Sequence, residues 1–142
     1  MLSTSCTKDD PSDNNHGFGF DVDAVDSTTG ISVKYNEADT FQFPIELIVE
    51  TYHITENCLG LYSDKGPPVI ITNNSNNLII NGVQFSGYFY HSPPLVVVHD
   101  GLLSMNDTFR LEHEFIHYLL QANGQNPNHT EENQILFDRC SI

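Results

Sequence analysis

Hydrophobic side chains in the first half of the chain recur at two different spacings. In residues 18–22 and 31–35 they occupy every second position, which is typical of strands with one buried face. In residues 45–52 they lie three and four apart, which is typical of a helix, and Gly60 can end it. Alternation within that segment also fits a strand. We favour the helix.

Three short hydrophobic runs follow in the middle of the chain, over residues 69–71, 78–83 and 95–98, the second continuing for several more residues. Asparagine-rich residues 73–77 and the prolines of residues 92–94 separate them, and both segments favour turns. We therefore expect strands that pair in an antiparallel or mixed sheet.

The last third of the chain is predicted to be helical. In a helix over residues 108–122, hydrophobic side chains would occupy most of the circumference, so this helix should be largely buried. Asn106 or Asp107 can cap its start, and Asn123-Gly124 is a strong stop signal. A second helix is expected over residues 130–139. Strands followed by helices indicate an α+β fold.

Length and charge limit the number of domains and the kinds of partner. The 142 residues suit one domain, which we expect over residues 17–142, after a polar, flexible tether over residues 1–16. The 19 acidic residues against 5 basic ones give a net charge of −14, which repels phosphate backbones and anionic lipids. Nucleic-acid binding and polybasic membrane docking are therefore disfavoured. No run approaches the ~20 apolar residues that span a bilayer.

The predicted buried helix carries the sequence His113-Glu114-Phe115-Ile116-His117. Histidines four residues apart lie one turn apart on the same helical face, where both imidazoles can hold one metal ion. Glu114 lies about 100° round from His113, where its carboxylate can reach a water bound to that ion. Zinc held by three protein ligands keeps a position for water and lowers the pKa of that water toward about 7. The motif therefore indicates metal-assisted hydrolysis with Glu114 as general base.

A third ligand is needed to complete such a zinc site. The longer metzincin pattern is excluded, because Leu120 and Asn123 stand where that pattern has a glycine and a third histidine. His129 follows a turn over residues 124–128 that reverses the chain, so it can return to the histidine face of the helix. We favour His129. The alternatives are two glutamates at the start of the second predicted helix, Glu131 and Glu132.

The segment from His113 to Leu120, with Gly124 and His129, resembles the zincin metallopeptidases, in particular short bacterial predicted peptidases and SprT-like proteins. The resemblance implies a small twisted, mostly antiparallel sheet packed on the active-site helix. It also implies the site residues: zinc ligands His113, His117 and His129, with Glu114 as the catalytic residue.

An edge strand that binds extended peptide is a further implication of this resemblance. Residues 83–90 or 95–99 are the candidates for that strand. The expected function is a zinc-dependent peptidase acting on peptides or proteins. The alternative is a non-catalytic, zinc-containing surface lipoprotein that binds a partner. Glu114 favours catalysis, because metal ligation alone does not need that residue.

The three cysteines suggest where the protein works. Residues 2–6 resemble the end of a bacterial lipoprotein signal, in which small residues precede a lipidated cysteine, and residues 7–10 resemble the tether of Bacteroidetes-type lipoproteins. A lipid on Cys6 would leave Cys58 and Cys140 as a pair, for which a disulfide is expected in an oxidising compartment. Two unrelated buried thiols are the alternative. We expect an extracytoplasmic location, as an envelope lipoprotein of the outer membrane or periplasm, or as a secreted protein.

Other polar residues could support the site, although packing or surface exposure is the stronger interpretation for each. Candidate oxyanion donors or supporting groups are His91, His99, Tyr88, Tyr90 and Tyr118, and candidate carboxylates for orienting imidazoles are Asp100 and Asp138. The remaining hypothesis is a calcium site formed by Asp21, Asp23 and Asp26. These carboxylates lack a full EF-hand loop, so a solvated acidic turn is the favoured interpretation.

Overall fold

The structure is a computed structural model, and it describes residues 21–36, 43–100 and 108–141. Several expectations lie outside these described residues. They are the tether over residues 1–16 with its lipid site at Cys6, most of the strand over residues 18–22, and the helix caps at Asn106 and Asp107.

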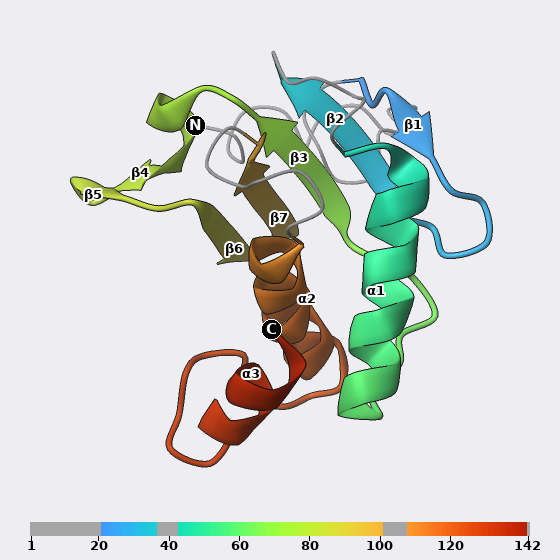
Figure 1. Cartoon of the computed structure of the whole chain (residues 1–142), viewed down its shortest axis with the longest axis vertical. Helices are drawn as coiled ribbons and strands as arrows, with labels where there is room; N and C mark the ends of the chain where they lie inside the picture. Colours follow the sequence, from blue (N-terminus) through green and yellow to red (C-terminus); the bar gives the residue numbers. More distant parts are fainter. Residues whose placement is uncertain (1–20, 37–42, 101–107, 142) are drawn as a thin grey trace.

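A five-stranded sheet forms one layer of the molecule, with the strand order β1-β2-β3-β7-β6 (Figure 1). Its strands are β1 (Ala24–Val25), β2 (Ser32–Asn36), β3 (Pro68–Thr72), β7 (Pro94–His99) and β6 (Gly87–His91). Together with the helices, this sheet confirms the α+β fold.

The sheet is mixed, with a parallel centre. β2 pairs parallel with β3, and β3 pairs parallel with β7, whereas the outer pairs β1–β2 and β6–β7 are antiparallel. The expectation of an antiparallel or mixed sheet is therefore confirmed as a mixed sheet, and the mostly antiparallel arrangement does not extend to the two central pairs. The helix between β2 and β3 returns the chain to the end of the sheet where β2 began, so the two strands run in the same direction. β3 and β7 are buried along most of their length, which explains their continuous hydrophobic runs.

The hydrophobic run from residue 78 toward residue 90 is divided into several elements. A 3-10 helix (Ser75–Leu78) leads into a separate hairpin of β4 (Ile79–Ile80) and β5 (Val83–Gln84), and β6 follows. Asn81 and Gly82 form the hairpin turn with φ angles of 52° and 80°. Asn-Gly favours this conformation because both positions need positive φ, and this signal ends the strand where hydrophobicity alone would continue it.

Two long helices lie side by side against the sheet, and a short third helix lies at the end of the molecule (Figure 1). They are α1 (Ile45–Leu59), α2 (Phe109–Ala122) and α3 (Gln134–Cys140). Gly60 ends α1 with a φ of 72°, as expected. Tyr52 of α1 packs edge to face on Phe115 of α2 with ring centroids 5.1 Å apart, between the helices and the sheet. No helix of the described residues is long and apolar enough to cross a membrane.

The expected disulfide between Cys58 and Cys140 is present, with Cα atoms 5.8 Å apart. It ties the end of α1 to the end of α3. α3 begins later than expected, after a turn over residues 130–133. In this turn the backbone N–H of Thr130 donates to Oδ1 of Asn133 at 2.8 Å, and the backbone N–H of Asn133 donates to Oγ1 of Thr130 at 3.2 Å. This turn and the disulfide lie at the two ends of α3.

Candidate metal centre

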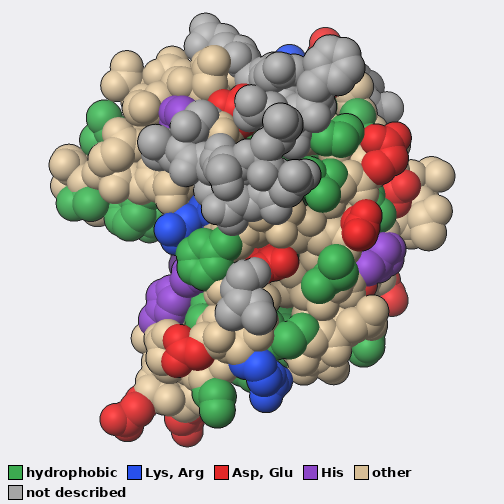
Figure 2. Space-filling view, viewed as in Figure 1, with side chains coloured by type: hydrophobic (Ala, Val, Ile, Leu, Met, Phe, Trp, Pro, Cys, Tyr) green, Lys and Arg blue, Asp and Glu red, His purple; other side chains and the backbone are tan. Residues whose placement is uncertain are grey.

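Three histidine side chains converge at the surface between α2 and α3. His113 and His117 lie one turn apart on α2, and the segment after that helix brings His129 to the same point. The Nε2 atoms of His113 and His129 are 3.1 Å apart, and one ligand nitrogen from each of the three residues lies within 4.8 Å of the others. These three residues can therefore hold one metal ion. Figure 2 shows histidine side chains along a hollowed edge of the molecule, on the side where α2 and α3 lie.

The loop after α2 is held in place by its own polar groups. Gly124 adopts a φ of 75° and lets the chain leave the helix axis. The side-chain amide of Asn133 then donates to the carbonyl oxygens of Asn126 and Asn128 at 3.1 and 2.8 Å. His129 follows directly and points back at α2. The reversal expected from residues 124–128 is confirmed.

Hydrogen bonds orient two of the imidazoles. His117 bonds through Nδ1 to the carbonyl oxygen of Pro127, which can only accept, so Nδ1 carries the proton and Nε2 keeps its lone pair. His129 bonds through Nδ1 to Oε1 of Gln134 at 3.3 Å, while Nε2 of Gln134 donates to Asp138 at 3.0 Å. Both rings thus present Nε2 to the shared point, as metal ligands with an orienting partner do.

Phe137 of α3 packs against all three imidazoles. Its ring centroid lies 5.0, 4.7 and 4.1 Å from those of His113, His117 and His129, and the residue is 2% exposed. A buried aromatic ring restricts the rotation of the three imidazoles. The sequence interpretation did not include Phe137, although it is the one aromatic residue of α3.

Burial keeps the two α2 histidines neutral. It lowers the pKa of His113 to about 3 and the pKa of His117 to about 4, and the neighbouring imidazoles add to both shifts. The carbonyl oxygen of Pro127 acts in the opposite direction on His117. Neutral imidazoles offer their lone pairs at physiological pH, and this is the state that binds a metal.

Glu114 faces the same cleft from the interior side. The residue is 3% exposed, and burial raises the pKa of its carboxyl to about 8, while the charge of Arg110 acts in the opposite direction. A proton affinity near neutrality suits a group that accepts a proton and later returns it.

Gly87 of β6 lets the carboxylate of Glu114 approach the sheet. A Cβ at this position would lie 2.7 Å from Cγ of Arg110 and 3.1 Å from Oε2 of Glu114. No ordinary side chain fits there without displacing one of them. Glycine inside a strand pattern is a known sign of a close approach, and this signal could have been found in the sequence.

The cleft has a volume of about 320 Å³ and lies between α2, the loop after it and β6. β6 is the last strand of the sheet among the described residues, with β7 on its other side. The prediction that residues 95–99 form the edge strand is wrong, because they belong to β7, which lies between β3 and β6. Within residues 83–90, the part from Gly87 onward belongs to the edge.

The other candidates have different places. Glu131 and Glu132 are exposed and do not join the histidine group. His91 and Tyr88 line the cleft. The remaining candidates are engaged elsewhere: His99 contacts Oγ of Ser75, the Tyr118 hydroxyl donates to the carbonyl of Lys65, Asp100 is buried at the end of β7, and Asp138 reaches Gln134 and not an imidazole.

Two of the three carboxylates of the calcium hypothesis are hydrogen-bonded within the protein. Oδ2 of Asp26 accepts from N and Oγ1 of Thr29 at 2.8 and 2.7 Å, and Asp23 accepts from the backbone N–H of Tyr35 at 2.7 Å. Among the described residues, Asp21, Asp23 and Asp26 do not form a metal-holding group. The solvated turn is the better interpretation.

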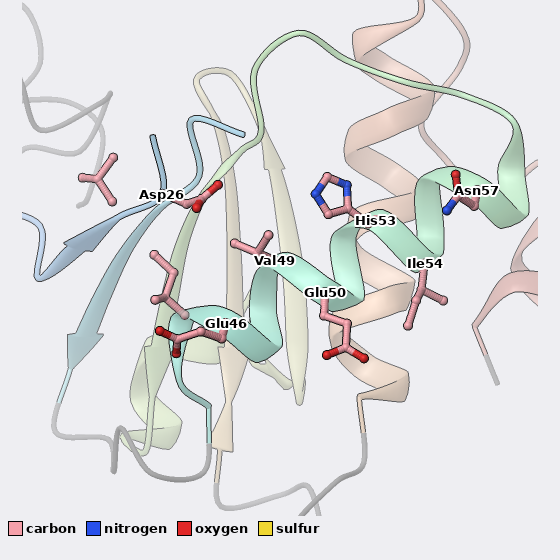
Figure 3. A pocket seen from close by; sticks show the side chains of 9 residues that line it. Asp26, Glu46, Val49, Glu50, His53, Ile54 and Asn57 are labelled. Atoms are coloured by element: carbon pink, nitrogen blue, oxygen red, sulfur yellow. The ribbon is translucent and has the colours of Figure 1, made fainter. Parts of the chain in front are cut away.

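A second hollow of about 590 Å³ lies beside the outer face of α1. Figure 3 shows Asp26, from the turn after β1, facing this helix, and the labelled α1 side chains are Glu46, Val49, Glu50, His53, Ile54 and Asn57. It holds carboxylates and an exposed Ile54 but no group of metal-ligating atoms among the described residues. Among the described residues, the side chains able to hold a metal together therefore gather at the histidine cleft.

Comparisons with protein-family models, with curated proteins and with solved structures found no match. The function is therefore inferred from the chemistry of the cleft itself.

Proposed function

We propose that the chain is a zinc-dependent peptidase. The observation that carries the proposal is the convergence of three imidazoles beside a buried carboxyl group, at the open edge of a sheet. Three neutral imidazoles suit zinc, which takes nitrogen ligands and keeps a fourth position for water in catalytic sites. Cation sites for magnesium or calcium would instead use oxygen ligands. The donor set therefore fits zinc.

His113, His117 and His129 would hold the metal, which supplies an activated water and polarises the carbonyl under attack. Glu114 would take the proton of the attacking water and return it to the leaving amine. Its burial against Gly87 supports this role, because a buried carboxylate is desolvated and held in place. A pure metal-binding module would not need a buried carboxyl group at the cleft, and this favours the peptidase over the non-catalytic alternative.

β6 is proposed to bind the substrate in extended form. In the antiparallel pair with β7, the N–H of His99 donates to the carbonyl of Ser86 at 2.9 Å. Inter-strand bonding alternates along such a pair, so Tyr88 and Tyr90 bond to β7 while Gly87 and Phe89 direct their backbone groups outward. A peptide can add to these groups as a further strand.

The proposed location is outside the cytoplasm, on a lipid-anchored or secreted protein. The disulfide between Cys58 and Cys140 supports this location, because such bonds persist in oxidising compartments. The sequence around Cys6 is the second support. Metabolic labelling of Cys6 with a fatty acid, compared with a Cys6→Ser variant, would test the anchor, and absence of labelling would leave the secreted form.

The activity is tested with the purified zinc-loaded chain, a library of quenched fluorescent peptides and the variant Glu114→Gln. We expect about one zinc per chain in both proteins, and loss of hydrolysis in the variant by a factor of at least about 100, in line with general-base removal. Glu131→Gln, which changes an exposed carboxylate outside the group, is the matched control and should keep full activity. Undiminished hydrolysis by Glu114→Gln would exclude the mechanism, and bound zinc without turnover would favour the binding module.

A further inference from the structure

Arg110 is the one lysine or arginine among the described residues that line the cleft. Basic residues are scarce in this chain, with 5 lysines and arginines in 142 residues. Arg110 lies one turn before Glu114 on α2, so the two side chains share the face that borders β6. The aliphatic stem of Arg110 packs against Gly87, where an added Cβ would meet Cγ at 2.7 Å. The cation is therefore held at the side of the cleft next to the proposed general base.

The guanidinium lacks a carboxylate partner within the described part of the chain. Its Nε atom is buried and makes no hydrogen bond, and no ion pair joins it to Glu114 or to another described acidic residue. Among the described residues, the ring of Phe109 lies under the guanidinium, with Cζ 5.0 Å from its centroid. A buried donor without an acceptor is costly, and arginine pairs best with a carboxylate through two parallel hydrogen bonds. Arg110 also lines the cleft, so a carboxylate bound there can supply the missing acceptor.

The direction of β6 defines which part of a substrate would reach Arg110. Gly87, at the start of β6, contacts Arg110 and Glu114, whereas Phe89 stacks on His117 and the carbonyl of His91 accepts from Gln121 at 2.9 Å. β6 and α2 therefore run in the same direction. A peptide pairing antiparallel with β6, the more stable of the two arrangements, would run from the His91 end toward Gly87. Its C-terminal half would lie beside Arg110.

We infer that Arg110 binds a carboxylate of the substrate on the C-terminal side of the scissile bond, either an acidic side chain or the terminal carboxylate. This inference rests on the proposed peptidase function. It makes Arg110 a specificity-determining residue, because a neutral amide at this position offers one accepting oxygen and no negative charge, whereas a carboxylate offers two accepting oxygens and a charge. The net charge of −14 repels polyacidic peptides at long range, so the preference concerns one carboxylate at one position.

The inference is tested by binding and by cleavage. The zinc-loaded Glu114→Gln protein is titrated with labelled peptides that carry one Glu or one Gln, on either side of the scissile bond mapped with the wild-type chain by mass spectrometry. A second peptide pair differs only in a C-terminal acid or amide. We expect about tenfold or more tighter binding of one carboxylate-bearing peptide, as charged hydrogen bonds contribute in protected sites. A preference for Glu over Gln would identify an acidic side chain as the ligand of Arg110. A preference for the C-terminal acid over the amide would identify the terminal carboxylate.

Three variants complete the test. Added to Glu114→Gln, Arg110→Gln should abolish the preference with zinc content unchanged, and Arg110→Glu should shift it toward a peptide with Lys at the same position. Arg139→Gln, an exposed arginine at the end of α3, is the matched control and should keep the preference. Equal binding of Glu and Gln peptides, binding of none of them, or a preference that survives Arg110→Gln would overturn the inference.

The two proposals fail separately. Hydrolysis without an Arg110-dependent preference would retain the peptidase and remove the role of Arg110. The pair of peptides that differ in a C-terminal acid or amide needs no mapped scissile bond. An Arg110-dependent preference within that pair, by a zinc-loaded chain that cleaves no peptide, would retain the recognition and remove the enzymatic function.

Discussion

The Nε2 atoms of His113 and His129 lie 3.1 Å apart although 16 positions separate the residues in the chain. Two nitrogens bound to one tetrahedral zinc, each at about 2.0–2.1 Å, are roughly 3.3 Å apart. Removing His129 should therefore lower zinc affinity by more than the roughly 10–100-fold that loss of an orienting partner costs. Competition with a chelator of known affinity measures this for His129→Ala.

Glu131 and Glu132 provide the control for that experiment. Both were alternative third ligands by sequence, and both are exposed outside the histidine group. Glu131→Ala and Glu132→Ala should each bind zinc as the wild type does. A larger loss of affinity in either variant than in His129→Ala would assign the third ligand to a glutamate.

Gln134 should tune the metal although it does not touch it. Its side chain accepts from Nδ1 of His129 and donates to Asp138, so it fixes the proton on the far nitrogen of the imidazole. We expect Gln134→Ala to weaken zinc binding by about 10–100-fold, with the fold intact by circular dichroism. Gln125→Ala, an exposed amide in the preceding loop, is the control. Equal affinities of the two variants would remove the orienting role of Gln134.

The sequence could predict the contacts of this site that join residues close together in the chain, but not those that join distant residues. The spacing of His113 and His117 is local, so helical geometry alone predicts their common face, and the turn after α2 similarly indicated His129. The roles of Phe137 and Gln134 depend on how α3 packs against α2, and no periodicity in the sequence encodes that packing. The sequence left the choice between an antiparallel and a mixed sheet open for a related reason, because strand direction depends on the path of α1 between β2 and β3.

The contact between Gly87 and Glu114 also joins residues far apart in the chain. Gly87→Ala should displace Arg110 or Glu114, and overpacking of this kind costs about 1–3 kcal/mol of unfolding free energy. We expect loss of peptide hydrolysis together with reduced stability in urea. Gly60→Ala is the control, since its φ of 72° brings backbone strain of roughly 1–2 kcal/mol without any nearby atom to displace. Full activity in Gly87→Ala would show that the close approach is dispensable.

The disulfide connects the stability of the fold to the metal centre. It joins positions separated by 82 residues and anchors the end of α3, the helix that carries Phe137 and Gln134. The double variant Cys58→Ser, Cys140→Ser should lose about 2–5 kcal/mol of unfolding free energy. It should also bind zinc more weakly, because α3 is released from α1. Treating the wild type with a reductant should reproduce both effects, whereas unchanged zinc affinity would mean that α3 is held by packing alone.

The metal-free chain should be most stable near pH 6.5, because buried groups of opposite type act on either side of that value. Burial lowers the pKa of His113 to about 3 and of His117 to about 4, from 6.5, so below pH 6.5 the unfolded chain binds more protons and stability falls with falling pH. Burial raises the pKa of Glu114 from 4.5 to about 8, so the folded chain holds an extra proton up to that pH and stability falls as the pH rises. Between pH 4.5 and 6.5, the ordinary pKa values of glutamate and histidine, the two histidines change the free energy of unfolding more steeply than the one carboxyl group does. Stability therefore still rises with pH in this range.

Urea unfolding of the chelator-treated chain at about pH 5, 6.5 and 8 measures this dependence through the free energy of unfolding. The glutamine of Glu114→Gln cannot titrate. The stability of this variant should therefore no longer fall as the pH rises from about 6.5 to 8, and it should still fall as the pH drops below 6.5. A wild-type stability that rises steadily up to pH 8 would show that Glu114 is already ionised in the metal-free protein. The carboxylate would then be available as a base without any help from the charge of the metal.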